Sequence, residues 1–192
     1  MSIELRNLTK SFGKNTVIKN FSLTVEKGER LAIVSYSGSG KTTLFRIMAG
    51  LDKRFEGEKN VEGTVALMFQ EDRLFEHSTV LENVTAVSNE SEEKASELLR
   101  RLGLSEHLNS YPEALSGGQR RRVALARALF YDGDVVLLDE CFTGLDPETK
   151  EITASVINEY TVGKTLLLIT HDREEAKLLN CKLLVYDKGF KF

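Results

Sequence analysis

A lysine and two threonines follow a stretch of small residues near the start of the chain, in a pattern suited to holding phosphate. The stretch comprises Ser35, Tyr36, Ser37, Gly38, Ser39, Gly40, Lys41, Thr42 and Thr43. It follows the short apolar run 30–34, typical of a buried strand, and precedes residues 44–49, which have a helical pattern. A strand, a small-residue loop and a helix in this order form a phosphate cradle, because loop N–H groups and the helix N-terminus both favour an anion.

The residue types within this loop suggest separate chemical roles. Lys41 is expected to reach the β- and γ-phosphates, and the Thr42 hydroxyl to bind Mg²⁺. Gly38 and Gly40 allow the main chain to approach the phosphates without a Cβ in the way. Ser35 stands where the P-loop pattern G-x-x-x-x-G-K-[ST] has its first glycine, so this position departs from the pattern. An ordinary strand-to-helix turn is the alternative, but Lys41 and Thr42 at the helix start favour the phosphate loop.

Two adjacent carboxylates, Asp139 and Glu140, end a continuous apolar run that begins at residue 134. Such a run predicts a fully buried parallel strand that delivers both side chains to its carboxyl end. Asp139 suits the shell of a Mg²⁺ ion, and Glu140 is placed to polarise an attacking water as a general base. Buried neighbouring carboxylates without a cation would be costly, which favours a functional interpretation.

Three single residues have two interpretations each when they are taken alone. Phe12, an aromatic in the predicted turn 11–15, could stack on a purine base or close the edge of a sheet. Gln70, at the end of the predicted strand 61–69, could reach a metal or water, although a solvated amide is the commoner case. His171 follows another buried strand and could donate to a phosphate oxygen or simply pack.

A second anion-binding surface is predicted where Ser116, Gly117 and Gly118 precede a helix over residues 120–129. The arginines 120–122 at the start of this helix could be taken for a nucleic-acid patch, but a solvated face with salt bridges is the more usual arrangement.

The composition fits a globular protein with one domain, or one domain with a small subdomain, and excludes some classes. The chain has 192 residues, of which 41% are hydrophobic and 29% charged, with a formal net charge of −3. This charge gives no overall basic surface, so nucleic-acid binding is not predicted. No apolar run reaches the length needed to cross a bilayer. Cys141 and Cys181 are far apart, without metal-ligand spacing, and are expected to be free thiols in a reducing cytosol.

The remaining patterns predict an α/β chain. It begins with antiparallel strands over 3–8 and 17–25, and from residue 79 the pattern becomes helical. Helices are predicted over 79–84, over 92–101 with Ser91 as the cap, and over part of 104–111. The last third alternates again between strand and helix, with strands over 164–170 and 182–186 and helices over 148–160 and 173–179.

The phosphate loop, the Asp139-Glu140 strand and Leu115-Ser116-Gly117-Gly118-Gln119 together resemble the ATP-binding-cassette (ABC) ATPases over nearly the whole chain, in the order of that family. The resemblance implies a P-loop NTPase core with a mostly parallel sheet, formed by residues 1–70 and 131–192 and including an N-terminal antiparallel β subdomain. A helical subdomain that carries the signature motif is expected to be inserted at about residues 71–130.

The same resemblance implies roles for the single residues. Phe12 is similar to the adenine-stacking A-loop aromatic, Gln70 to the Q-loop glutamine, Asp146 to the D-loop aspartate and His171 to the H-loop histidine. The implied catalytic residues are Lys41, Gln70, Glu140 and His171. The implied Mg²⁺ ligands are Thr42, Gln70 and Asp139. The implied ATP-binding residues are Phe12, Ser35, Ser37, Gly38, Ser39, Gly40, Lys41, Thr42, Thr43, Ser116, Gly117, Gly118, Gln119 and Asp146.

Two cassettes of this family pair head to tail, so the resemblance implies a second ABC ATPase subunit as partner. It further implies transmembrane permease subunits, a substrate-binding protein and a peripheral position on the cytoplasmic face of the membrane. Residues 111–118 resemble importer cassettes. Residues 139–146 are similar to a DEPFTGLD run common in importers of nitrate, sulfonate or thiamine-precursor type, with Cys141 in place of the proline.

Two alternatives to an importer subunit remain open at this point. One is a soluble ABC ATPase outside transport, of the type used in iron–sulfur assembly. The other is a nucleotide-binding regulatory subunit with weak hydrolysis, which is suggested by Ser35 in the phosphate loop.

Overall fold

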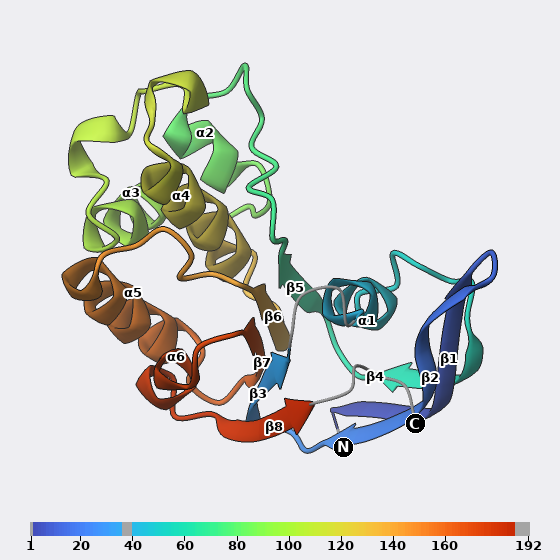
Figure 1. Cartoon of the computed structure of the whole chain (residues 1–192). Helices are drawn as coiled ribbons and strands as arrows, with labels where there is room; N and C mark the ends of the chain where they lie inside the picture. Colours follow the sequence, from blue (N-terminus) through green and yellow to red (C-terminus); the bar gives the residue numbers. More distant parts are fainter. Residues whose placement is uncertain (1, 36–39, 187–192) are drawn as a thin grey trace. The chain divides into compact units, whose positions relative to one another are not determined.

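The computed structural model describes residues 2–35 and 40–186, which divide into two compact units (Figure 1). The first unit holds the residues up to Leu67, Gly133–Asp139 and the described residues from Gly163 onward. The second unit holds Met68–Asp132 and Glu140–Val162. The helices of the described ranges include none that is both long and apolar enough to cross a membrane.

An antiparallel sheet in the order β2-β1-β4 opens the first unit, as the alternating pattern predicts. Its strands are β1 (Ile3–Phe12), β2 (Asn15–Val25) and β4 (Glu56–Val61). The turn between β1 and β2 is tighter than predicted, because both strands extend to Phe12 and Asn15, which face each other. Gly13 closes this turn with a φ of 59°, a conformation that glycine adopts without steric cost.

A five-stranded sheet in the order β5-β6-β7-β3-β8 forms the rest of the α/β core. Its strands are β3 (Arg30–Ser35), β5 (Val65–Met68), β6 (Val135–Asp139), β7 (Thr165–Thr170) and β8 (Lys182–Tyr186). β3 pairs in parallel with β7 and β8, and β6 pairs in parallel with β7. In this register Val34 lies opposite Thr170 and Asp139 lies opposite Ile169, so these strands end at one edge of the sheet. Ligands of open α/β sheets bind at this carboxyl edge.

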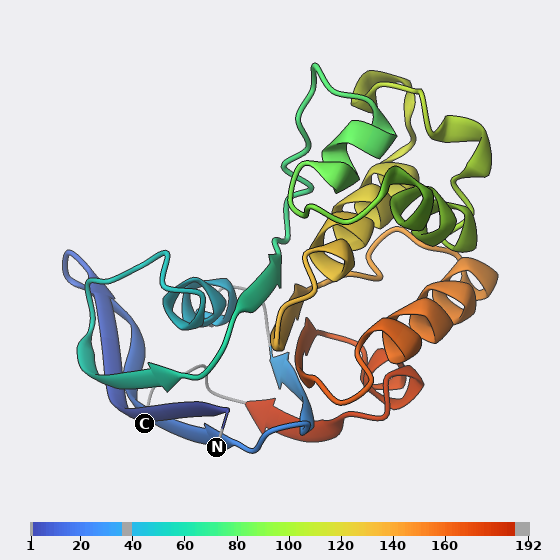
Figure 2. The ribbon, with the colours of Figure 1, turned by 180° about the vertical axis from the view of Figure 1, so that it is seen from behind.

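The described residues of the first unit include two helices: α1 (Lys41–Met48), which follows β3, and α6 (Arg173–Leu178), which follows β7. Figures 1 and 2, seen from opposite sides, show α1 between the antiparallel sheet and the parallel sheet. The buried side chains of α1, among them Phe45 and Ile47, join a hydrophobic core with residues of both sheets. This burial fixes the start of α1 at the carboxyl end of β3.

The single strand predicted over residues 61–69 is wrong. The chain leaves the antiparallel sheet at Val61 and enters the parallel sheet at Val65, with a turn at Gly63 between them. Gly63 has a φ of 84°, and a Cβ there would lie 2.5 Å from an oxygen of Asp134. The Asp134 carboxylate accepts hydrogen bonds from the backbone N–H and the hydroxyl of Thr64. The apolar pattern could not reveal this change of sheet, because both strands bury one face.

The second unit is helical. Its helices are α2 (Val80–Thr85), α3 (Glu92–Arg101), α4 (Gly117–Phe130) and α5 (Pro147–Tyr160). Ser91 caps α3 by accepting from the backbone N–H of Lys94, which confirms the predicted cap. The short helix expected within residues 104–111 is only a 3-10 turn, Ser105–His107, and Pro112–Ala114 forms another.

Candidate functional site

The hydroxyl of Thr42 and the carboxylate of Asp139 meet at the carboxyl edge of the parallel sheet. Thr42 Oγ1 donates to Asp139 Oδ2 over 2.7 Å, although the residues are 97 positions apart. Asp139 is the last residue of β6 and is only 2% exposed. The strand order and the buried core of α1 therefore bring together the two residues that sequence reasoning assigned to a Mg²⁺ shell.

Gly40 and Lys41 begin the helix beside this pair. Gly40 is the N-cap of α1 with a φ of 92°, and a Cβ there would lie 2.8 Å from the carbonyl oxygen of Val17 on β2. This position therefore excludes other residues, as predicted for a glycine of a phosphate loop. Lys41 is 7% exposed and Thr43 is half-buried.

The remainder of the predicted phosphate loop is only partly described. The backbone of Ser35 ends β3, one residue after Val34. Ser37, Gly38 and Ser39 lie outside the described residues. The described part of the cradle is therefore the strand end, the start of α1 and Asp139.

Glu140 differs from the prediction that two buried carboxylates end one strand. β6 stops at Asp139, and Glu140 has a φ of 51° and is half-buried. The left-handed conformation turns the chain at Glu140 and breaks the alternation of side chains that a strand would impose. Non-glycine residues in this conformation are uncommon, and they cluster at functional sites.

His171 and Gln70 are both exposed. His171 comes directly after Thr170, the last residue of β7, which lies opposite Val34 of β3. Its backbone is thus at the same sheet edge as Asp139. Gln70 follows β5, which is an edge strand of the sheet, and its carbonyl oxygen accepts a hydrogen bond from Arg121. The sequence assigned Gln70 to the end of a strand, and the structure adds this contact to α4.

Phe12 ends β1 with 52% of its surface exposed. The buried ammonium of Lys10 lies 4.7 Å from the centroid of its ring. Lys10 also forms an ion pair with Asp52, whose pKa it holds below the usual range through a hydrogen bond to the carboxylate. Sequence reasoning missed Lys10. The only signal was its inward position in the alternation of β1.

The signature residues Ser116 and Gln119 are occupied in capping α4. Gln119 N–H donates to Ser116 Oγ over 3.3 Å, and Ser116 N–H donates to Gln119 Oε1 over 2.8 Å. The Gln119 amide nitrogen also lies 2.9 Å from His107 Nε2. A Cβ added at Gly117 would meet no described atom within 4 Å, so the backbone there is open. The signature therefore offers main chain and a serine hydroxyl rather than the glutamine side chain.

Asp146 caps α5 in a similar way. Its carboxylate accepts from the hydroxyl of Thr149 over 2.6 Å and from the backbone N–H of Thr149 over 3.0 Å. These two hydrogen bonds lower the pKa of Asp146. A Cβ at Gly118 would lie 3.2 Å from the carbonyl oxygen of Gly144, so the start of α4 packs closely against the turn before α5.

The arginines of α4 were expected to form a solvated face with salt bridges; Arg120 and Arg121 form such salt bridges, but both side chains are half-buried. Arg120 pairs with Glu76 over 2.7 Å. Arg121 donates to the carbonyl oxygen of Phe69, and Arg122 to that of Leu102 over 2.6 Å. All three side chains are engaged in contacts within the second unit.

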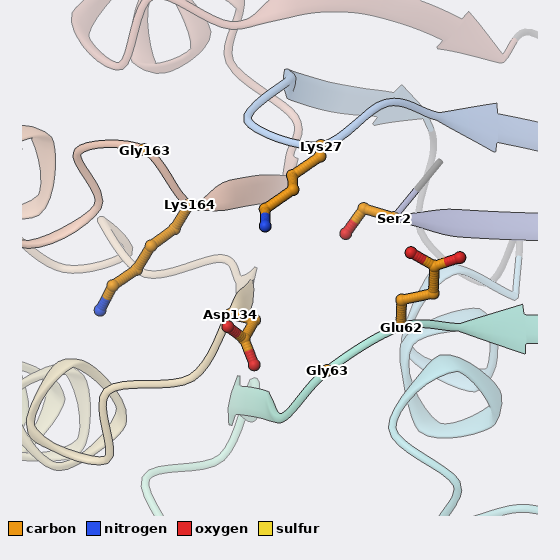
Figure 3. Close-up of a pocket in the computed structure, with 7 residues that line it drawn as sticks. All are labelled: Ser2, Lys27, Glu62, Gly63, Asp134, Gly163 and Lys164. Atoms are coloured by element: carbon orange, nitrogen blue, oxygen red, sulfur yellow. The ribbon is translucent and has the colours of Figure 1, made fainter.

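A cavity of about 150 Å³ lies at the opposite end of the parallel strands (Figure 3). The residues that line it are Ser2, Lys27, Glu62, Gly63, Asp134, Gly163 and Lys164. In the view of Figure 3, the Lys27 side chain points toward Asp134, whose carboxylate lies on the side of Gly63. Hydrogen bonds from Thr64, aided by the charge of Lys27, lower the pKa of Asp134. This cavity contains none of the predicted site residues.

The cysteines agree with the expectation of free thiols. Neither forms a disulfide, Cys141 is buried, and Cys181 is half-buried. Burial raises the pKa of the Cys181 thiol to about 11, so the thiolate is scarce at neutral pH.

Three features define the class of P-loop nucleotide-binding proteins. They are a helix that begins at a glycine, a buried aspartate that accepts a hydrogen bond from a threonine of that helix, and a parallel sheet. The family model described as ABC transporter matches residues 18–143. The chain belongs to the ABC transporter family, in which it is an ATP-binding cassette, and ATPase activity is characteristic of the family.

Relatives and solved structures agree with this assignment. The chain is 39% identical to the arginine transport ATP-binding protein ArtM of Bacillus subtilis, covering 97% of this chain and 88% of that protein. It is 40% identical to the aliphatic sulfonates import ATP-binding protein SsuB of Corynebacterium glutamicum, covering 96% and 80%. The structure resembles the dimeric ATP-binding cassette MJ0796 bound to ADP and Pi, with a TM-score of 0.87, 30% identity and coverage of 97% and 95%.

Proposed function

We propose that this chain is the ATP-hydrolysing subunit of an ABC importer, in which ATP-driven closure of two cassettes is coupled to transport. The hydrogen bond from Thr42 to Asp139 carries the proposal, because it joins the phosphate loop to a buried carboxylate at the ligand-binding edge of the sheet. The names of the relatives, which are ATP-binding proteins of arginine transport and sulfonate import, support the importer.

The residues around Lys41 fit a nucleoside triphosphate with Mg²⁺. A buried carboxylate and a neighbouring hydroxyl are the hard oxygen donors that Mg²⁺ prefers, so Thr42 and Asp139 would hold the ion, with Gln70 as a further ligand. Bound Mg²⁺ neutralises charge on the β- and γ-phosphates. Lys41 and the loop N–H groups would bind the same phosphates, and Phe12 would stack on the base.

Hydrolysis would use residues at the ends of β6 and β7. Glu140 would accept a proton from the attacking water, and His171 would donate a hydrogen bond to a γ-phosphate oxygen. The left-handed turn at Glu140 supports this role, because it separates the carboxylate from the buried metal-binding position of Asp139.

A second cassette would complete the site. In a head-to-tail pair, Ser116, Gly117 and Gly118 of one copy would cover the triphosphate held by the phosphate loop of the other, with Asp146 at the junction. The dimeric structures of MJ0796 support such a pair. Each copy has half a site, so ATP favours the closed pair through contacts that exist only in that state. Permease subunits, with a substrate-binding protein that delivers cargo, would convert closure into transport at the cytoplasmic face of the membrane.

Phosphate release by the transporter reconstituted with its permease tests the catalytic assignment. The Glu140→Gln variant should hydrolyse ATP about 10²–10⁴-fold more slowly than the parent, the usual cost of losing a general base. The Glu151→Gln variant, which changes an exposed glutamate of α5, serves as the matched control and should retain the parent rate. Equal rates for Glu140→Gln and the parent would contradict the assignment.

Two further measurements test dimerisation and transport. Light scattering of Glu140→Gln with saturating ATP and Mg²⁺ should give the mass of a dimer, whereas monomers alone would count against the paired site. Affinity purification of the chain from its native membranes should recover hydrophobic permease subunits. Recovery of soluble partners alone would favour an ATPase outside transport.

A further inference from the structure

Lys10 is a buried cation for which the proposed hydrolysis gives no role. Its side chain is 3% exposed, and Nζ lies 2.7 Å from Asp52 Oδ2 and 2.6 Å from the carbonyl oxygen of Arg54. Lysine is almost never fully buried unless it is paired, and these two acceptors account for its burial. They leave open why a cation is placed at this point of β1.

The ammonium of Lys10 also covers one face of an aromatic ring. Lys10 and Phe12 are two positions apart on β1, where the pairing with β2 shifts register, and their side chains meet. Nζ lies 4.7 Å from the centroid of the Phe12 ring, within the range of a cation–π contact. Phe12 is nevertheless 52% exposed, so the buried ammonium leaves a large part of this residue open to solvent.

The Phe12 ring lies on the β1–β2 hairpin, which packs against Gly40 of the phosphate loop. Phe12 lies opposite Asn15 at the start of β2, and the carbonyl oxygen of Val17, two residues further, is the atom that a Cβ at Gly40 would strike. Asp52, the ion-pair partner of Lys10, is bound to the C-terminal part of α1, because its backbone N–H donates to the carbonyl oxygen of Arg46 over 3.2 Å. The hairpin therefore approaches the start of α1 through Val17, and Lys10 links the hairpin to the segment that follows α1.

We infer that Lys10 is a positioning residue for the nucleotide base: it holds the Phe12 ring from behind and leaves the free ring face for the planar base of ATP. The inference rests on the proposed function. An ammonium behind the ring draws π-electron density toward itself, which favours stacking of an electron-rich purine on the other face. The same contact fixes the ring plane before the nucleotide arrives, so less side-chain freedom is lost on binding.

Calorimetric titration of the full chain with Mg-ATP and with Mg-tripolyphosphate, which lacks a base, separates this role from a structural one. Lys10→Met alone would leave the Asp52 carboxylate without its ammonium and could unfold the chain. The test variant is therefore Lys10→Met combined with Asp52→Asn. Asp52→Asn alone is the matched control, because it breaks the same ion pair but keeps the ammonium over the ring. Both are also made with Phe12→Ala.

The double variant should raise the Kd for Mg-ATP about threefold, because the Phe12 ring remains but is no longer held by the ammonium, and leave the Kd for Mg-tripolyphosphate unchanged. Asp52→Asn alone should change neither constant by more than about twofold. Phe12→Ala should raise the Kd for Mg-ATP about tenfold, and the double variant should add nothing in that background.

The inference would be overturned if Asp52→Asn alone weakened ATP binding as much as the double variant does. It would also be overturned if the double variant still raised the Kd for Mg-ATP threefold in the Phe12→Ala background, or if Phe12→Ala itself bound ATP as tightly as the parent. Its failure is distinct from failure of the proposed function. If Lys41→Ala abolishes binding of both ligands while the Lys10 variants bind ATP normally, the phosphate site stands and Lys10 has no part in base binding.

Discussion

The two compact units hold their polar groups in different ways. In the first unit, Thr42 and Asp139 come from distant elements and meet at the edge of a sheet, where neither is needed to cap a helix. In the second unit, Ser116 and Asp146 are N-caps, so their side chains already bind backbone N–H groups of their own helices. This difference indicates that the first unit holds Thr42 and Asp139 through a contact between distant elements, whereas the second unit, which also contains Glu140, holds Ser116 and Asp146 within their own helices.

The largest effect expected in the first unit comes from Asp139. Asp139→Asn keeps the shape of the side chain but removes the charge, and it should lower kcat for ATP hydrolysis by about 100-fold or more, because a catalytic metal supplies several kcal/mol of charge stabilisation. Urea unfolding measured in parallel should show no loss of stability, since a buried carboxylate is costly without a cation. If Asp139→Asn lowered the stability to urea but not kcat, Asp139 would have a structural role.

A substitution at Gly40 should affect folding more than any cap in the second unit. Gly40→Ala combines a φ of 92° with a contact of 2.8 Å to Val17, and about 2–3 kcal/mol of unfolding free energy should be lost in urea titrations. Gly13→Ala is the control, because its φ is also positive but no described atom lies within 4 Å of the added Cβ. It should cost about 1 kcal/mol. Equal losses would show that the approach of β2 does not constrain Gly40.

In the second unit, Ser116→Ala should cost about 1 kcal/mol of stability, the usual value of an N-cap, as measured by urea unfolding. Ser116→Gly should cost only a few tenths of a kcal/mol, because glycine is tolerated at an N-cap. If Ser116→Gly keeps stability but weakens ATP-dependent dimerisation, the Ser116 hydroxyl also contributes to binding the nucleotide held by the other cassette. If both variants dimerise like the parent, the signature contributes main chain alone.

The smallest expected effect is the acid dependence of the α5 cap. Hydrogen bonds from Thr149 lower the pKa of Asp146 in the folded chain below its value in the unfolded chain. The ionised cap therefore stabilises the fold above the unfolded pKa, about 3.9, and this stability is lost as the pH falls through the folded pKa. Unfolding curves of the parent and Asp146→Asn should differ at pH 7 and converge as the pH falls through the folded pKa of Asp146. A constant difference at all pH values would contradict this assignment.

Much of the fold and of the candidate site could be predicted from the sequence, because these features depend on local patterns. The apolar run before Asp139, the helix start at Lys41 and the cap at Ser91 follow from periodicity and from the preference of each residue type. The change of sheet at Gly63 could not be predicted, because it depends on Asp134, a residue much later in the chain that only the fold brings close. The left-handed turn at Glu140 was hidden for a similar reason, since an unbroken apolar run gives no sign of where its strand ends.

The roles of the signature side chains were also beyond the sequence. Serine and glutamine three positions apart fit both a capping box and a ligand surface, and the hydrogen bonds between Ser116 and Gln119 establish the capping box. Lys10 was missed because a charged residue in a strand is usually exposed, and only Asp52 and the Phe12 ring reveal its burial.

A crystal structure of the Glu140→Gln chain grown with ATP and Mg²⁺ tests the central claim most directly. The account predicts a head-to-tail dimer in which the triphosphate lies against Lys41 of one copy and Ser116 of the other, with Mg²⁺ between Thr42, Asp139 and the phosphates. ATP bound away from these residues, or bound to Lys41 in a chain that has no second copy over the phosphates, would contradict it.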